Sequence, residues 1–148
     1  MATTISTHSE PETASVAREL ARRLKAGSVV LLFGQLGAGK TAFVRGLAEG
    51  LGISPEAVNS PTFTLVQQYR GGRLPLLHVD LYRLDDPREI EDLGLDELGE
   101  DGVLAIEWAD KLPRSVAEAI EVRIEQGQGD ARHIAVVIPR QASRSDPP

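Results

Sequence analysis

The 148-residue sequence contains no cysteine, and it has few histidines and no long apolar run. Without cysteine, disulfides and thiolate metal sites are excluded. The three histidines, His8, His78 and His133, are too scattered along the chain to suggest a zinc site. No run of about 18 apolar residues occurs, so we expect no membrane span. The first residues, MATTISTHSEPET, lack the basic and apolar regions of a signal peptide, so we expect a cytoplasmic location.

Positive charge is also scarce, because the formal net charge is −6 and only three lysines occur. Proteins that hold nucleic acid by themselves usually present a basic patch, since phosphate contacts dominate their affinity. The segment RELARRLK is the only basic cluster, and it is typical of a solvated helix end. Direct nucleic-acid binding is therefore disfavoured. One of the three lysines, Lys40, lies in a glycine-rich segment and becomes a candidate functional residue.

Apolar spacing predicts helices and strands in alternation, as in an α/β domain. A helix is expected from about residue 9 to residue 25, capped by Ser9 or Thr13. The run SVVLLF predicts a strand that is buried on both faces. The segment TAFVRGLAEGL after the glycine loop has apolar residues on one side of a predicted helix.

The second half of the chain predicts further strands around short helices. Two extended stretches within residues 60–84 meet at a Gly-Gly turn, and residues 85–101 predict one or two short helices. GVLAIEW predicts another buried strand, and two alternating stretches from Ile120 and Ile134 predict an antiparallel hairpin. We expect one domain over residues 1–140 and a disordered tail over residues 141–148.

The segment LLFGQLGAGKTAF contains a phosphate-binding loop, with G-x-x-x-x-G-K-[ST] spacing at Gly34, Gly39, Lys40 and Thr41. Glycines let backbone N–H groups turn towards phosphate oxygens, and the following helix directs its positive end at the same group. Lys40 is expected to neutralise the β and γ phosphates, and the Thr41 hydroxyl to ligate Mg²⁺. The flanking strand and helix supply the required context. The sequence therefore predicts a nucleoside triphosphate site.

Two carboxylates stand at the ends of apolar strands, Asp80 after LLHV and Glu107 after VLAI. The carboxyl ends of parallel strands share one edge of the sheet, so both can approach Thr41 and the γ phosphate. One is expected to hold Mg²⁺, directly or through water, and the other to orient the attacking water. Alternatively, one of them only caps the following turn. The sequence does not divide these roles.

Two other residues have both a functional and a structural interpretation. Thr62, in NSPTFTLV, can sense the γ phosphate as switch threonines do. It can equally be an ordinary strand residue, since threonine favours strands. Trp108, the only tryptophan, can be a core anchor or a wall of the nucleotide site.

Several classes of phosphate-loop protein are disfavoured. A GTPase reads guanine with N-K-x-D, but the only asparagine, Asn59, is followed by serine. A small-molecule kinase usually has an arginine-rich lid, which is not evident, and a motor needs a longer chain. The remaining class is a minimal ATPase that can receive transition-state help in trans.

The segments GQLGAGKT, SPTFTLV, HVDLYRL and IEW, in this order, resemble the TsaE (YjeE) family over residues 9–138. This is the bacterial ATPase family of tRNA threonylcarbamoyladenosine biosynthesis. The resemblance implies an α/β, P-loop NTPase-like three-layer fold with a mixed, mainly parallel central sheet and a C-terminal antiparallel hairpin. It also implies weak Mg²⁺-dependent hydrolysis of ATP to ADP and phosphate. The partners would be TsaB and TsaD, whose complex would be reset between threonylcarbamoyl transfers, with tRNA reached only through that complex.

The resemblance also assigns residues. Asp80 matches a Walker-B-like aspartate, Glu107 a Mg²⁺-associated glutamate, and Thr62 lies in a switch-like segment. For Trp108, the resemblance favours a position at the nucleotide or partner surface over one in the core. Gln35 and Ala42 depart from common family residues, Asp and a second threonine, with little effect expected. The nucleotide-binding residues expected are Gly37, Ala38, Gly39, Lys40, Thr41, Ala42, Asp80, Trp108, Arg132, Thr7 and Ser9.

Two other functions stay open beside the ATPase. In one, ATP occupancy rather than hydrolysis drives a binding switch. In the other, the chain transfers phosphate to a small metabolite. The sequence also leaves open the oligomeric state, the docking surface and the source of a trans-acting arginine.

Overall fold

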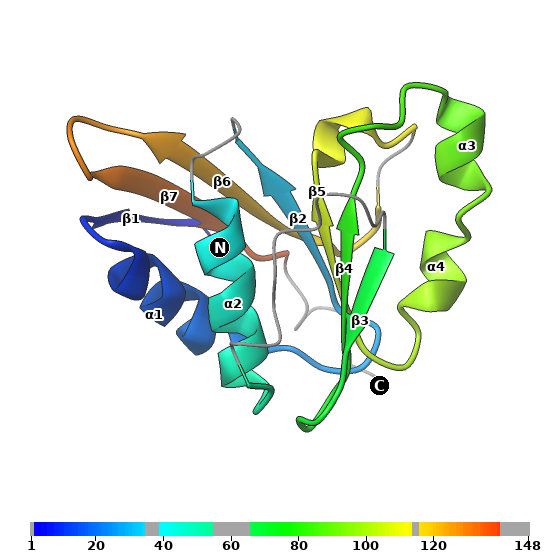
Figure 1. Ribbon diagram of the computed structural model, residues 1–148, viewed down its shortest axis with the longest axis horizontal. Helices are drawn as coiled ribbons and strands as arrows, with labels where there is room; N and C mark the ends of the chain where they lie inside the picture. The colour runs from blue at the N-terminus through cyan, green and yellow to red at the C-terminus, as the bar shows by residue number, and fades with distance from the viewer. Residues whose placement is uncertain (1, 35–38, 55–65, 114–115, 140–148) are drawn as a thin grey trace.

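The structure, a computed structural model, describes residues 2–34, 39–54, 66–113 and 116–139 (Figure 1). The predicted tail, residues 141–148, lies outside this part. The strands are β1 (Ala2–Thr7), β2 (Val29–Phe33), β3 (Val66–Tyr69), β4 (Leu76–Asp80), β5 (Val103–Glu107), β6 (Ile120–Gln126) and β7 (Arg132–Val137). The helices are α1 (Glu10–Ala21), α2 (Lys40–Gly50), α3 (Pro87–Glu91) and α4 (Leu95–Leu98), and a 3₁₀ turn, η2, spans Ala109–Lys111.

The strands form one mixed sheet in the order β1-β7-β6-β2-β5-β4-β3. The four central strands, β6, β2, β5 and β4, pair in parallel. β3 and β7 run antiparallel to their neighbours, and β6 and β7 form the predicted C-terminal hairpin. The fold class expected from the sequence, a mixed α/β fold with a mainly parallel central sheet, is confirmed.

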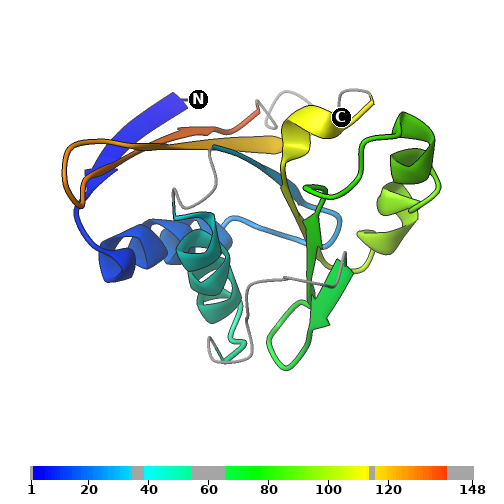
Figure 2. The ribbon, with the colours of Figure 1, turned by 45° about the horizontal axis from the view of Figure 1, so that its top comes forward.

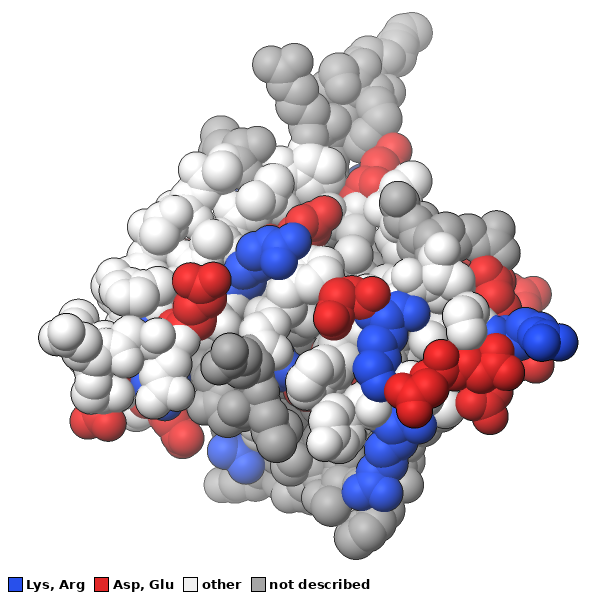
Figure 3. All heavy atoms as spheres, turned by 90° about the horizontal axis from the view of Figure 1, so that it is seen from above, with Lys and Arg blue, Asp and Glu red and all other residues white. Residues whose placement is uncertain are grey.

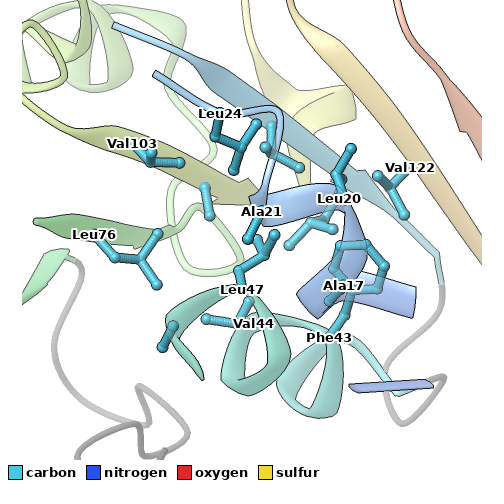
Figure 4. Close-up of a cluster of buried hydrophobic side chains, with 14 of the residues drawn as sticks. Ala17, Leu20, Ala21, Leu24, Phe43, Val44, Leu47, Leu76, Val103 and Val122 are labelled. Atoms are coloured by element: carbon cyan, nitrogen blue, oxygen red, sulfur yellow. The ribbon is translucent and has the colours of Figure 1, made fainter. Parts of the chain in front are cut away.

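Helices cover both faces of the sheet, which gives three layers (Figure 2). α1 and α2 lie on one face, where side chains such as Leu20, Phe43 and Leu47 pack against Val122 and Val103 (Figure 4). On the other face, Ile90 of α3 belongs to a second buried cluster with residues of β2, β4 and β5. Every residue of β5 is buried, as the continuous apolar run predicted. In the described part of the chain, no helix is long and apolar enough to cross a membrane.

α1 begins as predicted but ends earlier. Ser9 caps it, accepting a hydrogen bond from the N–H of Glu12. The helix was expected to reach residue 25, yet it ends at Ala21, and the following turn is held by i→i−3 hydrogen bonds. The Arg73 guanidinium donates to the carbonyl oxygens of Ala21 and Leu24, so a side chain distant in sequence satisfies this end.

The edge strand β1 was not predicted from the sequence. Its residues, ATTIST, are mostly exposed and show little apolar alternation. The strand pairs antiparallel with β7, from Ala2 opposite Val137 to Thr7 opposite Arg132. Its conformation therefore depends on the open edge of the hairpin rather than on its own pattern.

Small residues bring α1 and α2 into close contact. A Cβ atom added at Gly46 would lie 2.2 Å from the carbonyl oxygen of Ala14 and 2.8 Å from Cβ of Ala17. At Gly50, one turn further, it would lie 2.5 Å from Cβ of Ala21. The helix that begins at the phosphate loop is thus packed backbone to backbone against α1.

We predict that Gly46→Ala destabilises the protein, although alanine is the better helix former by about 0.5–1 kcal/mol. The added methyl group has no space, and overpacking should lower the free energy of unfolding by about 1–3 kcal/mol. Urea denaturation monitored by circular dichroism measures the change. Arg23→Ala, at an exposed position in the turn after α1, is the control and should change it by about 0.5 kcal/mol or less. A more stable Gly46→Ala protein would contradict the close packing.

Candidate functional site

The candidate site lies at the carboxyl ends of β2, β4 and β5, where the loop after β2 leads into α2 (Figure 1). Both ends of this loop need glycine. Gly34 has φ +147°, and a Cβ atom there would lie 2.4 Å from the carbonyl oxygen of Ile124. Gly39, with φ +104°, is the N-cap of α2. Gly37 and Ala38 lie outside the described residues, as does Thr62.

Lys40, the first residue of α2, is buried with 4% of its surface exposed. Its ammonium group donates to the carbonyl oxygen of Gly34 at 2.9 Å. It also lies 4.0 Å from Oε1 of Glu107 and 4.3 Å from the centroid of the Trp108 ring. Burial lowers the pKa of Lys40, and the negative charge of Glu107 is the largest opposing effect. A buried ammonium group is therefore held at the loop between a carbonyl, a carboxylate and an aromatic face.

The two strand-end carboxylates are brought together, as expected from the sequence. β4 and β5 pair in parallel with Asp80 opposite Glu107, so both side chains project from the same face of the sheet. That face carries α1 and α2, because Leu76 and Ala105 of the same strands belong to the core beneath these helices. The negative charges of both carboxylates oppose the burial that lowers the pKa of Lys40.

Asp80 caps the turn that follows β4, which is the structural alternative considered from the sequence. One oxygen, Oδ1, accepts a hydrogen bond from the N–H of Tyr82 at 2.9 Å and so stabilises the turn after β4. Burial raises the pKa of Asp80, the Tyr82 N–H opposes this, and the charge of Glu107 raises it further. Asp80 is therefore a half-buried carboxylate whose pKa is raised mainly by burial.

Glu107 is more deeply buried, and its partner is a residue that the sequence reasoning missed. Oε2 of Glu107 lies 2.5 Å from Nε2 of His78, which has no exposed surface. The sequence contained a signal in HVD: two residues apart on one strand, His78 and Asp80 share a face. That pattern does not by itself identify Glu107 as the partner, because the contact also depends on the pairing of β4 with β5.

Trp108 lies between the core and the site. It has a left-handed backbone with φ +59° and packs partly against the second apolar cluster. Its ring lies below the Lys40 ammonium group and 5.1 Å from the ring of Tyr82, which is half-exposed. A hollow of about 560 Å³ opens beside it, lined among others by Phe33, Gly34 and Arg123. Trp108 thus packs on the second apolar cluster and also borders the hollow and the Lys40 ammonium group, and its role as a wall of the nucleotide site stays a prediction.

The more distant candidates differ in position. Nε of Arg132 lies 3.9 Å from where a Cβ atom of Gly39 would stand, so this arginine reaches the loop. Thr7 pairs with Arg132 across β1 and β7, but its hydroxyl bonds to that of Thr13 at 2.8 Å. Ser9 is exposed and caps α1. The hydroxyl groups of Thr7 and Ser9 thus have local structural partners.

The candidate metal ligands at the site, Thr41, Asp80 and Glu107, all offer oxygen atoms, which Mg²⁺ prefers. Thr41 is the second residue of α2, and Ala42 beside it is buried. The described residues include no group of three or more His, Cys, Asp or Glu able to hold a metal by itself. Mg²⁺ characteristically uses one or two carboxylates and completes its shell with water and substrate phosphates. The Thr41 hydroxyl with the carboxylates of Asp80 and Glu107 fits that pattern.

Comparison with known families agrees with this geometry. The model of the family "Threonylcarbamoyl adenosine biosynthesis protein TsaE" matches residues 7–134. The chain belongs to the TsaE family. The match spans both the phosphate loop and the strand-end carboxylates, so the resemblance seen in the sequence is confirmed.

TsaE relatives cover most of the chain. The tRNA threonylcarbamoyladenosine biosynthesis protein TsaE of Bacillus subtilis is 47% identical over 83% of this chain and 77% of its own length. The protein of the same name from a Nostoc species is 44% identical over 86% of this chain and 80% of its own. A crystal structure of Bacillus subtilis YdiB superposes with a TM-score of 0.73 at 35% identity, covering 94% of this chain and 87% of that one.

We predict that Asp80→Asn melts at a higher temperature than the wild type at about pH 8, without Mg²⁺ or nucleotide. Folding raises the pKa of Asp80 above 3.8. The resulting stability is present in full below pH 3.8 and is lost as the pH rises through the folded pKa. Asparagine does not ionise and can still accept from the Tyr82 N–H.

The advantage of Asp80→Asn should therefore shrink as the pH falls towards 3.8, which melting curves at a series of pH values will show. Asp110→Asn, which removes an exposed carboxylate also near Lys40, is the control and should leave the melting temperature unchanged. A wild type that is the more stable protein at about pH 8 would mean that attraction to Lys40 outweighs burial.

Proposed function

We propose that this chain binds ATP with Mg²⁺ and hydrolyses it to ADP and phosphate as part of tRNA threonylcarbamoyladenosine biosynthesis. One observation carries the proposal: the Lys40 ammonium group, at the start of α2, lies 4.0 Å from the Glu107 carboxylate of a neighbouring strand end. P-loop NTPases use a lysine at the start of such a helix to bind the phosphates and a nearby strand-end carboxylate to hold Mg²⁺. Membership of the TsaE family supports the biological context.

Lys40 and α2 would hold the phosphates. The ammonium group needs a polar partner because it is buried, and Gly34 supplies one carbonyl oxygen. Phosphate oxygens can take over that interaction, and their charge would favour the protonated lysine against the effect of burial. The first N–H groups of α2 add the positive end of the helix dipole. Arg132, close to Gly39, is a further cation for the nucleotide.

Thr41, Glu107 and Asp80 would serve Mg²⁺ and the attacking water. Bound Mg²⁺ would neutralise charge on the phosphates. We assign Glu107 to the metal side, because it is the more buried carboxylate and has a fixed partner in His78. We assign Asp80 to orienting the water, since burial raises its pKa and Oδ2 is not used by the turn.

TsaB and TsaD are the proposed partners, with tRNA bound by the complex rather than by this chain. The acidic net charge supports this division. The view onto the upper side of the molecule shows basic side chains interspersed with acidic ones among the described residues (Figure 3). Such a surface is poorly suited to holding a phosphate backbone by itself.

We predict that Lys40→Ala lowers the rate of ATP hydrolysis about 100-fold or more, because it removes a positive charge that stabilises the transferred phosphoryl group. Phosphate release measured with TsaB and TsaD present provides the test. Lys25→Ala, which removes an exposed lysine, is the matched control and should hydrolyse ATP at the wild-type rate. An active Lys40→Ala protein would overturn the proposed site.

Asp80→Asn separates hydrolysis from ATP occupancy. If hydrolysis resets the partners, this variant should bind ATP but support only about one round of tRNA modification per complex. Multiple-turnover and single-turnover modification assays distinguish these outcomes. Sustained turnover with little hydrolysis would favour the occupancy switch. ATP consumption stimulated by a small metabolite instead of the partner proteins would favour a phosphotransferase.

A further inference from the structure

His78 is the most deeply buried polar side chain at the site, yet the proposed reaction assigns it no direct contact with substrate. It lies in the middle of β4 with 0% exposure, and its Nε2 is 2.5 Å from Oε2 of Glu107. A carboxylate accepts hydrogen bonds, so Nε2 carries the hydrogen. Nδ1, on the other side of the ring, has no hydrogen-bond partner among the described residues. Within the part of the chain that the structure describes, Glu107 is therefore the one hydrogen-bond partner of the ring.

The sheet explains why this contact forms. In the β4–β5 pairing, His78 stands opposite Ala105 and Asp80 opposite Glu107, all on one face. Ala105 has a small side chain, and the imidazole of His78 reaches diagonally past this position to Glu107, two residues along β5. The register of two neighbouring strands thus places the histidine against the acid.

A buried carboxylate needs such a partner. Glu107 is 6% exposed, and leaving its charge without hydrogen bonds would be costly. The hydrogen bond to His78 holds Oε2 of Glu107 against the neighbouring strand β4. Oε1, the other oxygen, is then the one that lies 4.0 Å from the Lys40 ammonium group. The two carboxylate oxygens are therefore inequivalent before any ligand arrives.

We propose that His78 is a positioning residue that fixes the side chain of Glu107, so that Glu107 presents a single oxygen, Oε1, to the metal-nucleotide side of the site. This rests on the proposed function, because it concerns the same Mg²⁺ and ATP site. Residues that orient a metal-ligating group through a hydrogen bond commonly determine metal affinity without touching the metal. His78 would act in this way, because it contacts the proposed metal ligand Glu107.

Two substitutions separate the hydrogen bond from the space that the ring fills. In His78→Gln the amide nitrogen stands as many bonds from the backbone as Nε2, so it can still donate to Glu107. In His78→Asn the amide nitrogen matches the position of Nδ1 instead, so the shorter side chain cannot reach Glu107. Both are polar and smaller than histidine, so each controls for the other in its effect on packing.

The measurement is the affinity for a slowly hydrolysed ATP analogue, with Mg²⁺ and in EDTA. The fluorescence of Trp108 reports binding, since this only tryptophan lies against Lys40. Calorimetry checks the values. We expect His78→Asn to reduce the enhancement by Mg²⁺ about tenfold, with the metal-free affinity within about twofold of wild type and His78→Gln close to wild type. In a Glu107→Gln background, His78→Asn should add no further loss.

Other results would overturn either the positioning role of His78 or the proposed function as well. If the wild type binds the analogue with Mg²⁺ and His78→Asn keeps the full enhancement, the positioning role is wrong while the proposed function stands. If the metal-free and Mg²⁺-bound affinities fall together, or if Gln and Asn behave alike, His78 only supports the fold. If the wild type does not bind the analogue under either condition, both proposals are overturned.

Discussion

The parallel pairing of β4 with β5 is the constraint on which the site depends. With Asp80 opposite Glu107, the register brings two acids from separate parts of the chain to one edge and one face. A shift by one residue would turn one of them to the opposite face, where α3 packs. The same register places His78 beside Ala105 and so allows the hydrogen bond to Glu107. Burial of both strands fixes the register, because a shift would move their apolar side chains out of the two cores.

The other half of the site is held by close packing rather than by sheet register. α2 carries Lys40 at its first turn, and the contact of Gly46 with Ala14 fixes that helix against α1. At the other side, Gly34 lies against the backbone of β6, so the loop leaves β2 in a direction that only glycine allows. Lysine and carboxylates thus meet because a helix–helix contact and a sheet register are both satisfied.

The sequence allowed prediction of what has a local pattern, and little of what depends on distant partners. Continuous apolar runs predicted β2 and β5, glycine spacing predicted the loop, and strand-end position predicted the pair Asp80 and Glu107. The β1 strand was missed because its polar residues adopt that conformation only against β7. The HVD pattern places His78 and Asp80 on one face, but the contact between His78 and Glu107 also requires that β4 lie beside β5, which local spacing does not contain. The resemblance to the TsaE family indicated Arg132, but only the fold shows how the start of β7 reaches Gly39.

The electrostatics of the site bear on the proposed binding of ATP and Mg²⁺. Burial acts against the charged forms of both Lys40 and Asp80, so the fold holds these groups at some expense of stability. Trp108, itself in a left-handed conformation, covers the lysine. Strain and buried charge of this kind persist at sites whose ligand relieves them. A phosphate group would satisfy the ammonium, and Mg²⁺ the carboxylates, so ligand binding would stabilise the same residues that destabilise the free protein.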